Sequence, residues 1–178
     1  EFVGYDNLFC DSNVLCIVQD NSIVNEISNG EEAEIVVDKT PFYSTSGGQI
    51  HDTGIFKNSS FEAKVLDCLK TSKGIYLHKI KVIRGELQKD DQVSLKVDSI
   101  NRNLTSCNHS STHILHQVLK DSFGNHISQK GSLVSPERLR FDFSHSSSIK
   151  SDDLFRLEND VNKIIRENTK VIIREMNI

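Results

Sequence analysis

This sequence lacks long apolar runs and paired CxxC cysteines. A membrane-spanning helix needs about 20 consecutive apolar residues, and a signal peptide needs a basic stretch followed by an apolar one; neither pattern occurs. The four cysteines, at positions 10, 16, 68 and 107, form no regular framework. Reduced thiols in a reducing compartment fit this usage better than disulfides do. These absences predict a soluble cytoplasmic protein with no membrane partner.

A start methionine is also absent, since the chain opens with Glu1-Phe2 and its only methionine is Met176. We therefore expect an excised piece of a longer protein. Its 178 residues, of which 37% are apolar, are enough for one large domain or two small ones with a real core.

A basic surface is absent as well, because 21 lysines and arginines stand against 25 acidic residues, a formal net charge of -4. Phosphate contacts demand positive charge, so this balance argues against a self-sufficient nucleic-acid binder. An RNA partner would need help from other parts of the protein, and no DNA partner is expected. The local basic clusters are interpreted as ordinary solvated faces; they are Lys79, Lys81 and Arg84, then Arg138 and Arg140.

Short β-branched runs separated by turns fill the chain from about residue 13 to 98. A spacing of about ten residues between runs is typical of a small all-β barrel. The expected strands cover residues 14–18, 33–37, 61–66, 75–82 and 93–97. The turns contain glycine, which tolerates positive φ where a strand reverses; they are Asn29-Gly30, Gly47-Gly48, Ser72-Lys73-Gly74 and Arg84-Gly85. We predict a small antiparallel β-barrel over residues 1–98.

Near residue 99 the apolar spacing changes from every second position to about every 3.6 positions, which indicates a helix. Gly124 fits its C-terminal stop, while Asn103, Thr105 and Ser106 are all candidate N-caps among which the pattern does not choose. A strand over 138–143, a helix from Ser151 and a strand over 170–174 are expected to follow. The apolar face of the first helix comprises Leu104, Ile114, Leu115, Val118, Leu119 and Phe123. The second domain, residues 99–178, is therefore expected to mix helices and strands.

Two histidines one helical turn apart, His109 and His113, form the strongest candidate site. Residues four apart share a helix face, so both imidazoles could bind one zinc ion, and His116 continues along roughly the same side. Ser110 stands where a metalloprotease carries its glutamate, which excludes HExxH chemistry. Cys107, two residues before His109, points to another face. Because this spacing also arises by chance on many helices, metal binding and a purely structural role both stay open.

Hydroxyls and glycines crowd residues 40–54, with the sequence TPFYSTSGGQIHDTG. Backbone amides could approach a ligand here, but the Lys-Ser/Thr ending of a Walker phosphate loop is missing. On pattern alone we favour a wide hairpin between two barrel strands.

Three stretches of this chain together resemble the editing region of alanyl-tRNA synthetases. Residues 2–5 are similar to the start of that region, residues 40–54 resemble its TPFYxxSGGQxxDxG stretch, and residues 108–145 resemble NHxxTHxLHxxL and HxxQxGSLVxPxRLRFDFxH. A bare HxxxH also occurs in threonyl-tRNA synthetase editing domains and free-standing editing proteins, whereas SGGQ and FDFSH narrow the resemblance to the alanyl group. It implies an α+β fold, in which a small antiparallel β-barrel (1–98) precedes a two-layer α/β editing core of the threonyl/alanyl type (99–178).

The resemblance also implies a site. His109 and His113 would supply half of a zinc site, whose Cys-x-x-x-His half lies downstream of Ile178 in the family, so these residues alone would form an incomplete site. Thr112 and Gln129 would be catalytic residues that hold the substrate; a helix back-bond for Thr112 and a capping role in a loop for Gln129 are the structural interpretations. The acceptor end would also contact Ser46, Gly47, Gly48 and Gln49.

The implied activity is hydrolysis of mischarged Ser-tRNA(Ala) and Gly-tRNA(Ala), in which water attacks the aminoacyl ester. A synthetic pocket for alanine rejects serine by only about 1–3 kcal/mol, so a second site that requires the hydroxyl is needed. The whole enzyme would ligate alanine to tRNA(Ala) with ATP, and the acceptor end of that tRNA would be the partner. The alternatives are a free-standing trans-editing deacylase, a non-catalytic tRNA-docking module and a generic zinc hydrolase.

Overall fold

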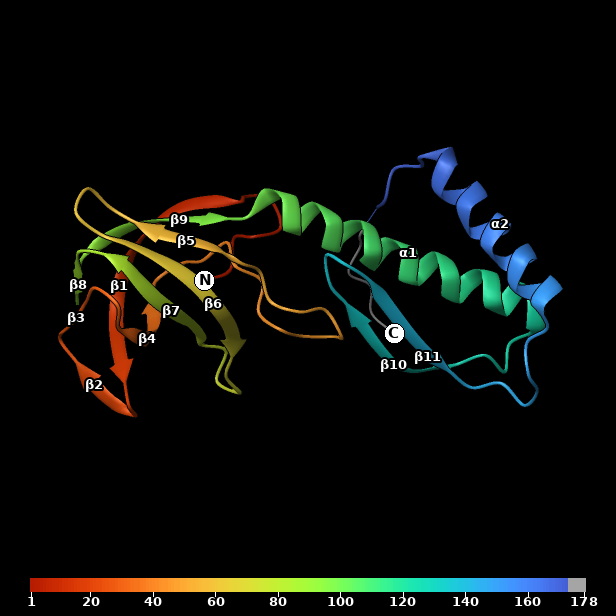
Figure 1. The fold of residues 1–178 in the computed structure, drawn as a ribbon, viewed down its shortest axis with the longest axis horizontal. Helices are drawn as coiled ribbons and strands as arrows, with labels where there is room; N and C mark the ends of the chain where they lie inside the picture. Colours follow the sequence, from red (N-terminus) through yellow and green to blue (C-terminus); the bar gives the residue numbers. More distant parts are fainter. Residues whose placement is uncertain (173–178) are drawn as a thin grey trace.

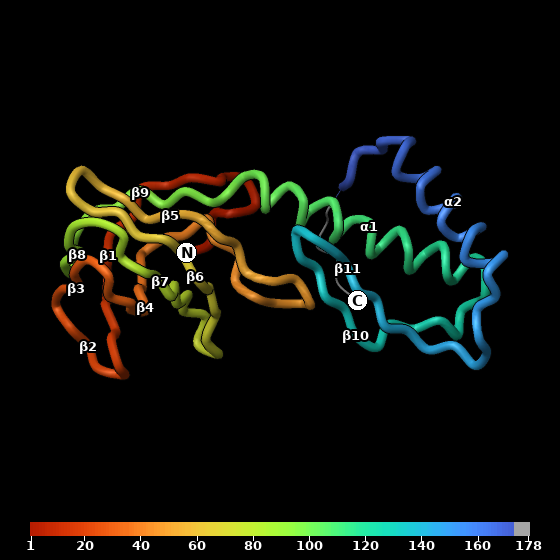
Figure 2. Tube along the Cα trace, in the orientation of Figure 1, coloured from red at the N-terminus to blue at the C-terminus, as the bar shows by residue number. Residues whose placement is uncertain are grey.

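The computed structural model describes residues 1–172, which form two parts joined by one helix (Figure 1). A β-barrel occupies one end of the molecule. Helix α1 (Ser99–Phe123) leaves the barrel and crosses to the other end, where it meets a two-stranded hairpin and α2 (Ser151–Glu167). The chain trace follows the same path, with the hairpin and α2 on different sides of α1 (Figure 2). The predicted α+β class is confirmed in this form.

Six strands close the barrel in the order β1-β4-β7-β6-β5-β9, and antiparallel pairing of β9 with β1 completes the ring. Short strands extend it: β2 (Ser22–Val24) pairs with β1, and β3 (Glu26–Ser28) pairs with β8 (Glu86–Gln88). The ring strands are β1 (Phe9–Gln19), β4 (Glu32–Val37), β5 (Gly54–Lys57), β6 (Glu62–Lys70), β7 (Tyr76–Arg84) and β9 (Gln92–Val97). The predicted antiparallel barrel is therefore confirmed.

Alternation along the strands builds the barrel core, because successive side chains of a strand point to opposite faces. Strand β4 buries Ala33, Ile35 and Val37 and leaves the residues between them more exposed. Phe42 and Phe56 are fully buried at the centre. Strands β2, β3, β5 and β8 had no predicted counterpart, because three or four residues are too few for an alternation to be recognised.

One aspartate begins α1. The Asp98 carboxylate accepts two backbone N–H groups of the first turn at 3.0 and 3.1 Å, and Gly124 ends the helix with φ 104°. The predicted stop at Gly124 is confirmed, whereas the predicted N-caps Asn103, Thr105 and Ser106 are wrong. They lie inside the helix because only Asp98 separates the last barrel strand from α1.

The second part packs around the far half of α1. Strands β10 (Gln129–Val134) and β11 (Leu139–Phe143) form an antiparallel hairpin, so Gln129 begins a strand rather than lying in a loop as expected. The predicted strand over 138–143 and the helix from Ser151 are confirmed. The predicted strand over 170–174 is absent at 170–172, and its last two residues lie outside the described part of the chain. The small core comprises Val118, Leu119, Ile127 and Leu157.

Residues 38–53, here called the strap, join β4 to β5. These strands are not neighbours, since β4 pairs with β1 and β7 while β5 pairs with β6 and β9. The prediction of a hairpin between two barrel strands is therefore wrong in its pairing. The strap leaves the barrel and runs toward the β10–β11 hairpin (Figure 1). Within residues 1–172, no helix is long and apolar enough to cross a membrane.

Candidate functional site

A buried histidine holds the first residues of the strap inside the barrel. Nδ1 of His78 donates to the Ile35 carbonyl at 3.1 Å, so its Nε2 accepts the Thr40 hydroxyl at 2.8 Å. The ring is fully buried beside Phe42 and Phe56, and this burial lowers the pKa of His78 to about 4. A neutral His78 therefore fixes the start of the strap.

A buried ion pair holds the other end of the strap on α1. Arg102, in the first turn of α1, pairs with Asp52, and the two side chains are 17% and 4% exposed. The same guanidinium donates to the carbonyls of Gly4 at 2.7 Å and Pro41 at 2.9 Å. Asp52 also accepts the backbone N–H of Tyr43 at 2.7 Å. This pair has no local signal in the sequence, because the arginine and its partner are 50 residues apart.

The tip of the strap packs on β10. Ser46 and Gln49 close a turn through reciprocal backbone hydrogen bonds of 2.9 and 3.1 Å, and Val134 joins the strap through two more, of 2.8 and 3.1 Å. Gly48 has φ 85°, and a side chain there would meet the Ser132 carbonyl oxygen at 2.6 Å. The predicted turn glycine is therefore confirmed, and the close approach to β10 is a second reason for glycine.

Strap and helix meet at His109. Oε1 of Gln49 lies 2.6 Å from Nδ1 of His109; an amide oxygen only accepts, so Nδ1 carries the proton and Nε2 keeps its lone pair. The rings of His109 and His113 stack with centroids 5.2 Å apart. Gln49 is 8% exposed, His109 is half-buried and His113 is exposed. Burial, and then the charge of His113, lowers the pKa of His109.

Thr112 and Gln129 lie in different settings. Thr112 is 5% exposed and donates its hydroxyl to the Asn108 carbonyl at 2.9 Å, a back-bond within the helix. Its oxygen keeps lone pairs that can accept a further hydrogen bond. Gln129 is exposed, and no hydrogen bond within residues 1–172 joins its side chain to the histidines. The catalytic role of both residues stays a prediction, as does substrate contact by the exposed Ser46 and Gly47.

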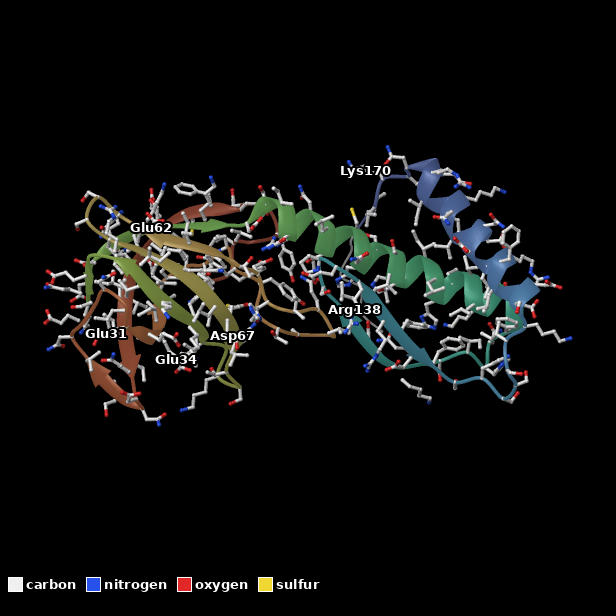
Figure 3. All side chains as sticks on the ribbon, viewed as in Figure 1. Glu31, Glu34, Glu62, Asp67, Arg138 and Lys170 are labelled. Atoms are coloured by element: carbon white, nitrogen blue, oxygen red, sulfur yellow. The ribbon has the colours of Figure 1, made fainter. Side chains whose placement is uncertain are left out.

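Asn108 ties α1 to the turn after β10. Its Nδ2 donates to the carbonyls of Ser135 at 2.8 Å and Pro136 at 3.3 Å. The same turn carries Arg138, which lies at the end of the hairpin nearer the barrel (Figure 3). Helix α1 therefore contacts the hairpin turn through Asn108 and the strap tip through His109, one residue further along.

The donor set fits part of a zinc site. Imidazole nitrogens one helical turn apart are common zinc ligands, and such sites use three or four protein ligands. In the described residues, no group of three or more His, Cys, Asp or Glu side chains lies close enough to hold a metal ion. His116 instead packs on Phe141, with ring centroids 5.0 Å apart, and Cys107 is exposed. His109 and His113 therefore offer two imidazoles one helical turn apart, and Gln49 forms a hydrogen bond with one of them.

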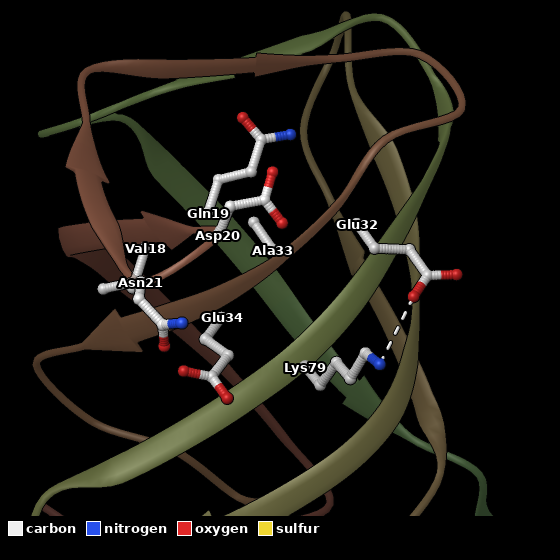
Figure 4. Close-up of a pocket in the computed structure, with 8 residues that line it drawn as sticks. All are labelled: Val18, Gln19, Asp20, Asn21, Glu32, Ala33, Glu34 and Lys79. Carbon is white, nitrogen blue, oxygen red and sulfur yellow. Dashed lines mark ion pairs between the residues drawn. The ribbon is translucent and has the colours of Figure 1, made fainter.

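A separate hollow lies in the barrel wall, lined by residues of β1, β4 and β7 and the turn after β1 (Figure 4). The carboxylates of Asp20, Glu32 and Glu34 outnumber its one lysine, Lys79, whose Nζ lies 3.4 Å from Glu32. Excess negative charge repels phosphate, so this hollow does not fit a nucleic-acid backbone. The ion pair also agrees with the interpretation of Lys79 as part of a solvated face.

A family model described as tRNA synthetases class II (A) matches residues 1–101. This stretch comprises the N-terminal segment, the barrel with its strap, and the first residues of α1. It therefore includes Gln49 but not the two histidines.

Curated alanine–tRNA ligases are similar to the chain over nearly all of its length. The protein of Geobacillus thermodenitrificans is 48% identical over 172 residues, 97% of this chain. Those of Listeria innocua and Endomicrobium trichonymphae are 45% and 41% identical over 178 and 177 residues, 100% and 99% of this chain. In each case the matched region is 20% of the relative, so the chain spans about a fifth of the length of these proteins.

Proposed function

This chain belongs to the alanine–tRNA ligase family, and from that premise we propose that its strap, α1 and β10–β11 hairpin form part of an editing site for mischarged tRNA(Ala). The reaction is hydrolysis of the ester that joins serine or glycine to the terminal ribose. The whole protein ligates alanine to tRNA(Ala) with ATP, and this region removes its errors. Residues 1–98 form the barrel domain, and residues 99–178 belong to an editing core of the threonyl/alanyl type.

The hydrogen bond between Gln49 and His109 carries this proposal. The two residues come from segments that are 60 positions apart, the SGGQ stretch and the NHxxTH stretch. Both segments belong to the set of stretches that together resemble the editing region, and in the fold their polar side chains meet at one place. A hairpin turn and a structural histidine pair in separate locations would not account for that meeting.

The chemistry needs a water molecule, an oriented ester and a way to stabilise charge. A zinc ion held by His109 and His113 together with the family's Cys-x-x-x-His would make water more acidic or polarise the ester carbonyl. Water adds to the carbonyl carbon, the bond to the ribose oxygen breaks, and the free amino acid and the tRNA leave. Gln49 holds the proton on Nδ1 of His109. The lone pair of Nε2 therefore stays available to bind the metal ion.

Selectivity rests on the hydroxyl of serine. Thr112, the residue before His113 on α1, is buried, and its oxygen keeps acceptor capacity after the back-bond to Asn108. Gln129 begins the strand that supports the strap tip. An alanyl ester would leave such polar groups unpaired in a desolvated site, which costs about 1–3 kcal/mol for each group. Glycyl ester lacks the hydroxyl as well, so this contact bears on the selection of serine alone.

The tRNA partner touches this region only at its acceptor end. A formal net charge of -4 does not support a long phosphate interface, so other parts of the ligase hold most of the tRNA. Arg138 supplies positive charge at the end of the hairpin nearer the barrel. Gly47 and Gly48 of the strap tip would offer backbone N–H groups to the acceptor end.

The test is deacylation of Ser-tRNA(Ala), Gly-tRNA(Ala) and Ala-tRNA(Ala) by the whole ligase, with zinc content measured for each preparation. We expect loss of serine and glycine and retention of alanine. His109→Ala combined with His113→Ala should remove zinc from this region and slow serine release by more than about 100-fold. His126→Ala is the matched control, because His126 is exposed and pairs with His145 away from the strap, and it should keep both zinc and activity.

Several outcomes would contradict the proposal. Full activity in the double histidine variant would remove the histidines from the site. Equal hydrolysis of simple esters without tRNA would favour a generic hydrolase. Binding of tRNA without deacylation by the unmodified ligase would leave a docking module as the better account.

A further inference from the structure

Gln49 is the strap side chain that meets the histidine pair. Its Oε1 lies 2.6 Å from Nδ1 of His109. The residue is only 8% exposed, so this oxygen forms its hydrogen bond with His109 rather than with solvent. No side-chain hydrogen bond within residues 1–172 reaches the ring of His113, which is exposed. The two imidazoles of the pair are therefore held differently.

We infer that Gln49 is a positioning residue, which fixes the Nδ1–H tautomer and the ring orientation of His109 so that Nε2 keeps a free lone pair for a cation. This inference rests on the proposed function, because it assigns a role within the same site. A neutral imidazole carries its proton on either nitrogen, and only one tautomer leaves Nε2 free. Ligand histidines usually donate their other N–H to an oxygen, which tunes metal affinity.

A side chain can fix a tautomer only when its own position is fixed. The backbone of Gln49 closes a turn with Ser46 through hydrogen bonds of 2.9 and 3.1 Å, and its neighbour Gly48 accepts from Val134 at 2.8 Å. Gly48 also lies against Ser132, so a residue with a side chain at this position would clash with Ser132. These contacts attach the strap tip to β10, so Gln49 does not depend on His109 for its place.

The base of the strap adds a second constraint. Asp52, three residues after Gln49, pairs with Arg102 on the same helix that carries His109. The strap therefore contacts α1 at its first turn and again at His109, which lies nearer the middle of the helix. Barrel and helix cannot shift relative to each other without disturbing it.

Substrate contact by Gln49, the role expected from the sequence, leads to a different result. An amide that binds substrate would have to release His109 first, and its removal would weaken substrate binding while leaving the imidazole unchanged. An amide that positions His109 affects the imidazole and the metal even when no tRNA is present. The two roles can therefore be separated without measuring activity.

The experiment compares Gln49→Leu, which removes the acceptor, with Gln49→Glu, which retains one. Gln92→Leu is the matched control, since Gln92 is an exposed barrel residue. The tautomer of His109 is read from the imidazole ¹⁵N shifts of the chain labelled at histidine, assigned with His109→Ala. The Zn²⁺ affinity of the whole ligase is measured by competition with a chelator. Thermal unfolding checks that each variant is folded, and Gln49→Glu keeps the test valid if leucine destabilises the strap.

We expect an Nδ1–H imidazole at His109 in the unmodified chain, in Gln49→Glu and in Gln92→Leu, and its loss in Gln49→Leu. Zinc affinity should fall about 10- to 100-fold in Gln49→Leu alone. An Nε2–H tautomer in the unmodified chain, or an unchanged tautomer and affinity in Gln49→Leu, would overturn the inference while leaving editing intact. A ligase that binds no zinc and deacylates nothing would instead overturn the proposed function.

Discussion

The barrel and the second part of the molecule are stabilised to very different degrees. In the described residues, the barrel core contains eighteen buried apolar residues, whereas the core around α1, α2 and the hairpin contains four. The barrel closes on itself through β1 and β9, while α2 leaves Leu154 54% and Phe155 70% exposed. The buried core of the barrel is therefore large enough to stabilise its fold, whereas the second part depends on contacts with residues outside it.

This difference explains why the candidate site lies at the junction. Buried apolar area is the main source of stability, and the second part has little of it. The strap connects the better-packed barrel to the helix that carries the histidines. Its two contacts with that helix are made to Arg102 by Asp52 and to His109 by Gln49.

The barrel should suffer most from truncation of a core ring. Phe56 is fully buried, with ring centroids 5.7 Å from Phe42 and 5.3 Å from His78. Phe56→Ala should lower the free energy of unfolding by about 3–5 kcal/mol, measured by denaturant titration. Ile23→Ala, at a site that is 75% exposed, should change it by less than about 0.5 kcal/mol. Similar losses in both variants would mean that the barrel core is not the main source of stability.

The junction should respond almost as strongly. Arg102→Ala leaves the buried carboxylate of Asp52 without its partner and should cost about 3 kcal/mol, with faster amide exchange in the strap. Arg156→Ala removes an ion pair with Asp153 whose side chains are 59% and 29% exposed, and should cost less than about 1 kcal/mol. If strap exchange stayed at its original rate in Arg102→Ala, the two parts would not be coupled through this arginine.

Mild acid should weaken the barrel through His78. Its pKa is about 4 when folded and 6.5 when unfolded, so the unfolded chain binds the proton first and stability falls as pH drops below 6.5. Between pH 7 and pH 5 this group alone should cost about 2 kcal/mol. Denaturant titration at both pH values measures the loss, and His78→Gln should show a smaller difference between them. An equal loss in the variant would assign the acid effect to other groups.

The smallest effect is expected at the start of α1. Asp98→Ala removes the N-cap and should cost about 1 kcal/mol, seen as faster amide exchange in the first turn. Asp98→Asn keeps an acceptor oxygen and should retain most of the protection. A loss as large as that of Arg102→Ala would show that the cap, rather than the ion pair, links helix to barrel.

Local patterns predicted the regular parts of the fold and failed at the contacts between distant segments. Alternation predicted β4 and β9, and the i, i+4 spacing predicted that His109 and His113 share a helix face, where their rings stack. No local sequence pattern shows that β4 and β5 pair with other strands rather than with each other, because the closure of the barrel decides which strands are neighbours. Gln49 was visible as part of a glycine-rich stretch, but its partner is 60 residues away, so its role in the site follows only from the fold.

Arg102 and His109 are seven residues apart on α1. At about 100° and 1.5 Å per residue, seven steps make nearly two full turns and a rise of about 10 Å, so both side chains lie on the same face. The strap can therefore reach both, with Asp52 on one and Gln49 on the other. The strap therefore fits α1 only when these two residues lie on the same face of the helix. Removing one residue between them would turn both histidines together by about 100° away from Gln49. This stretch of helix can thus vary in composition far more easily than in length.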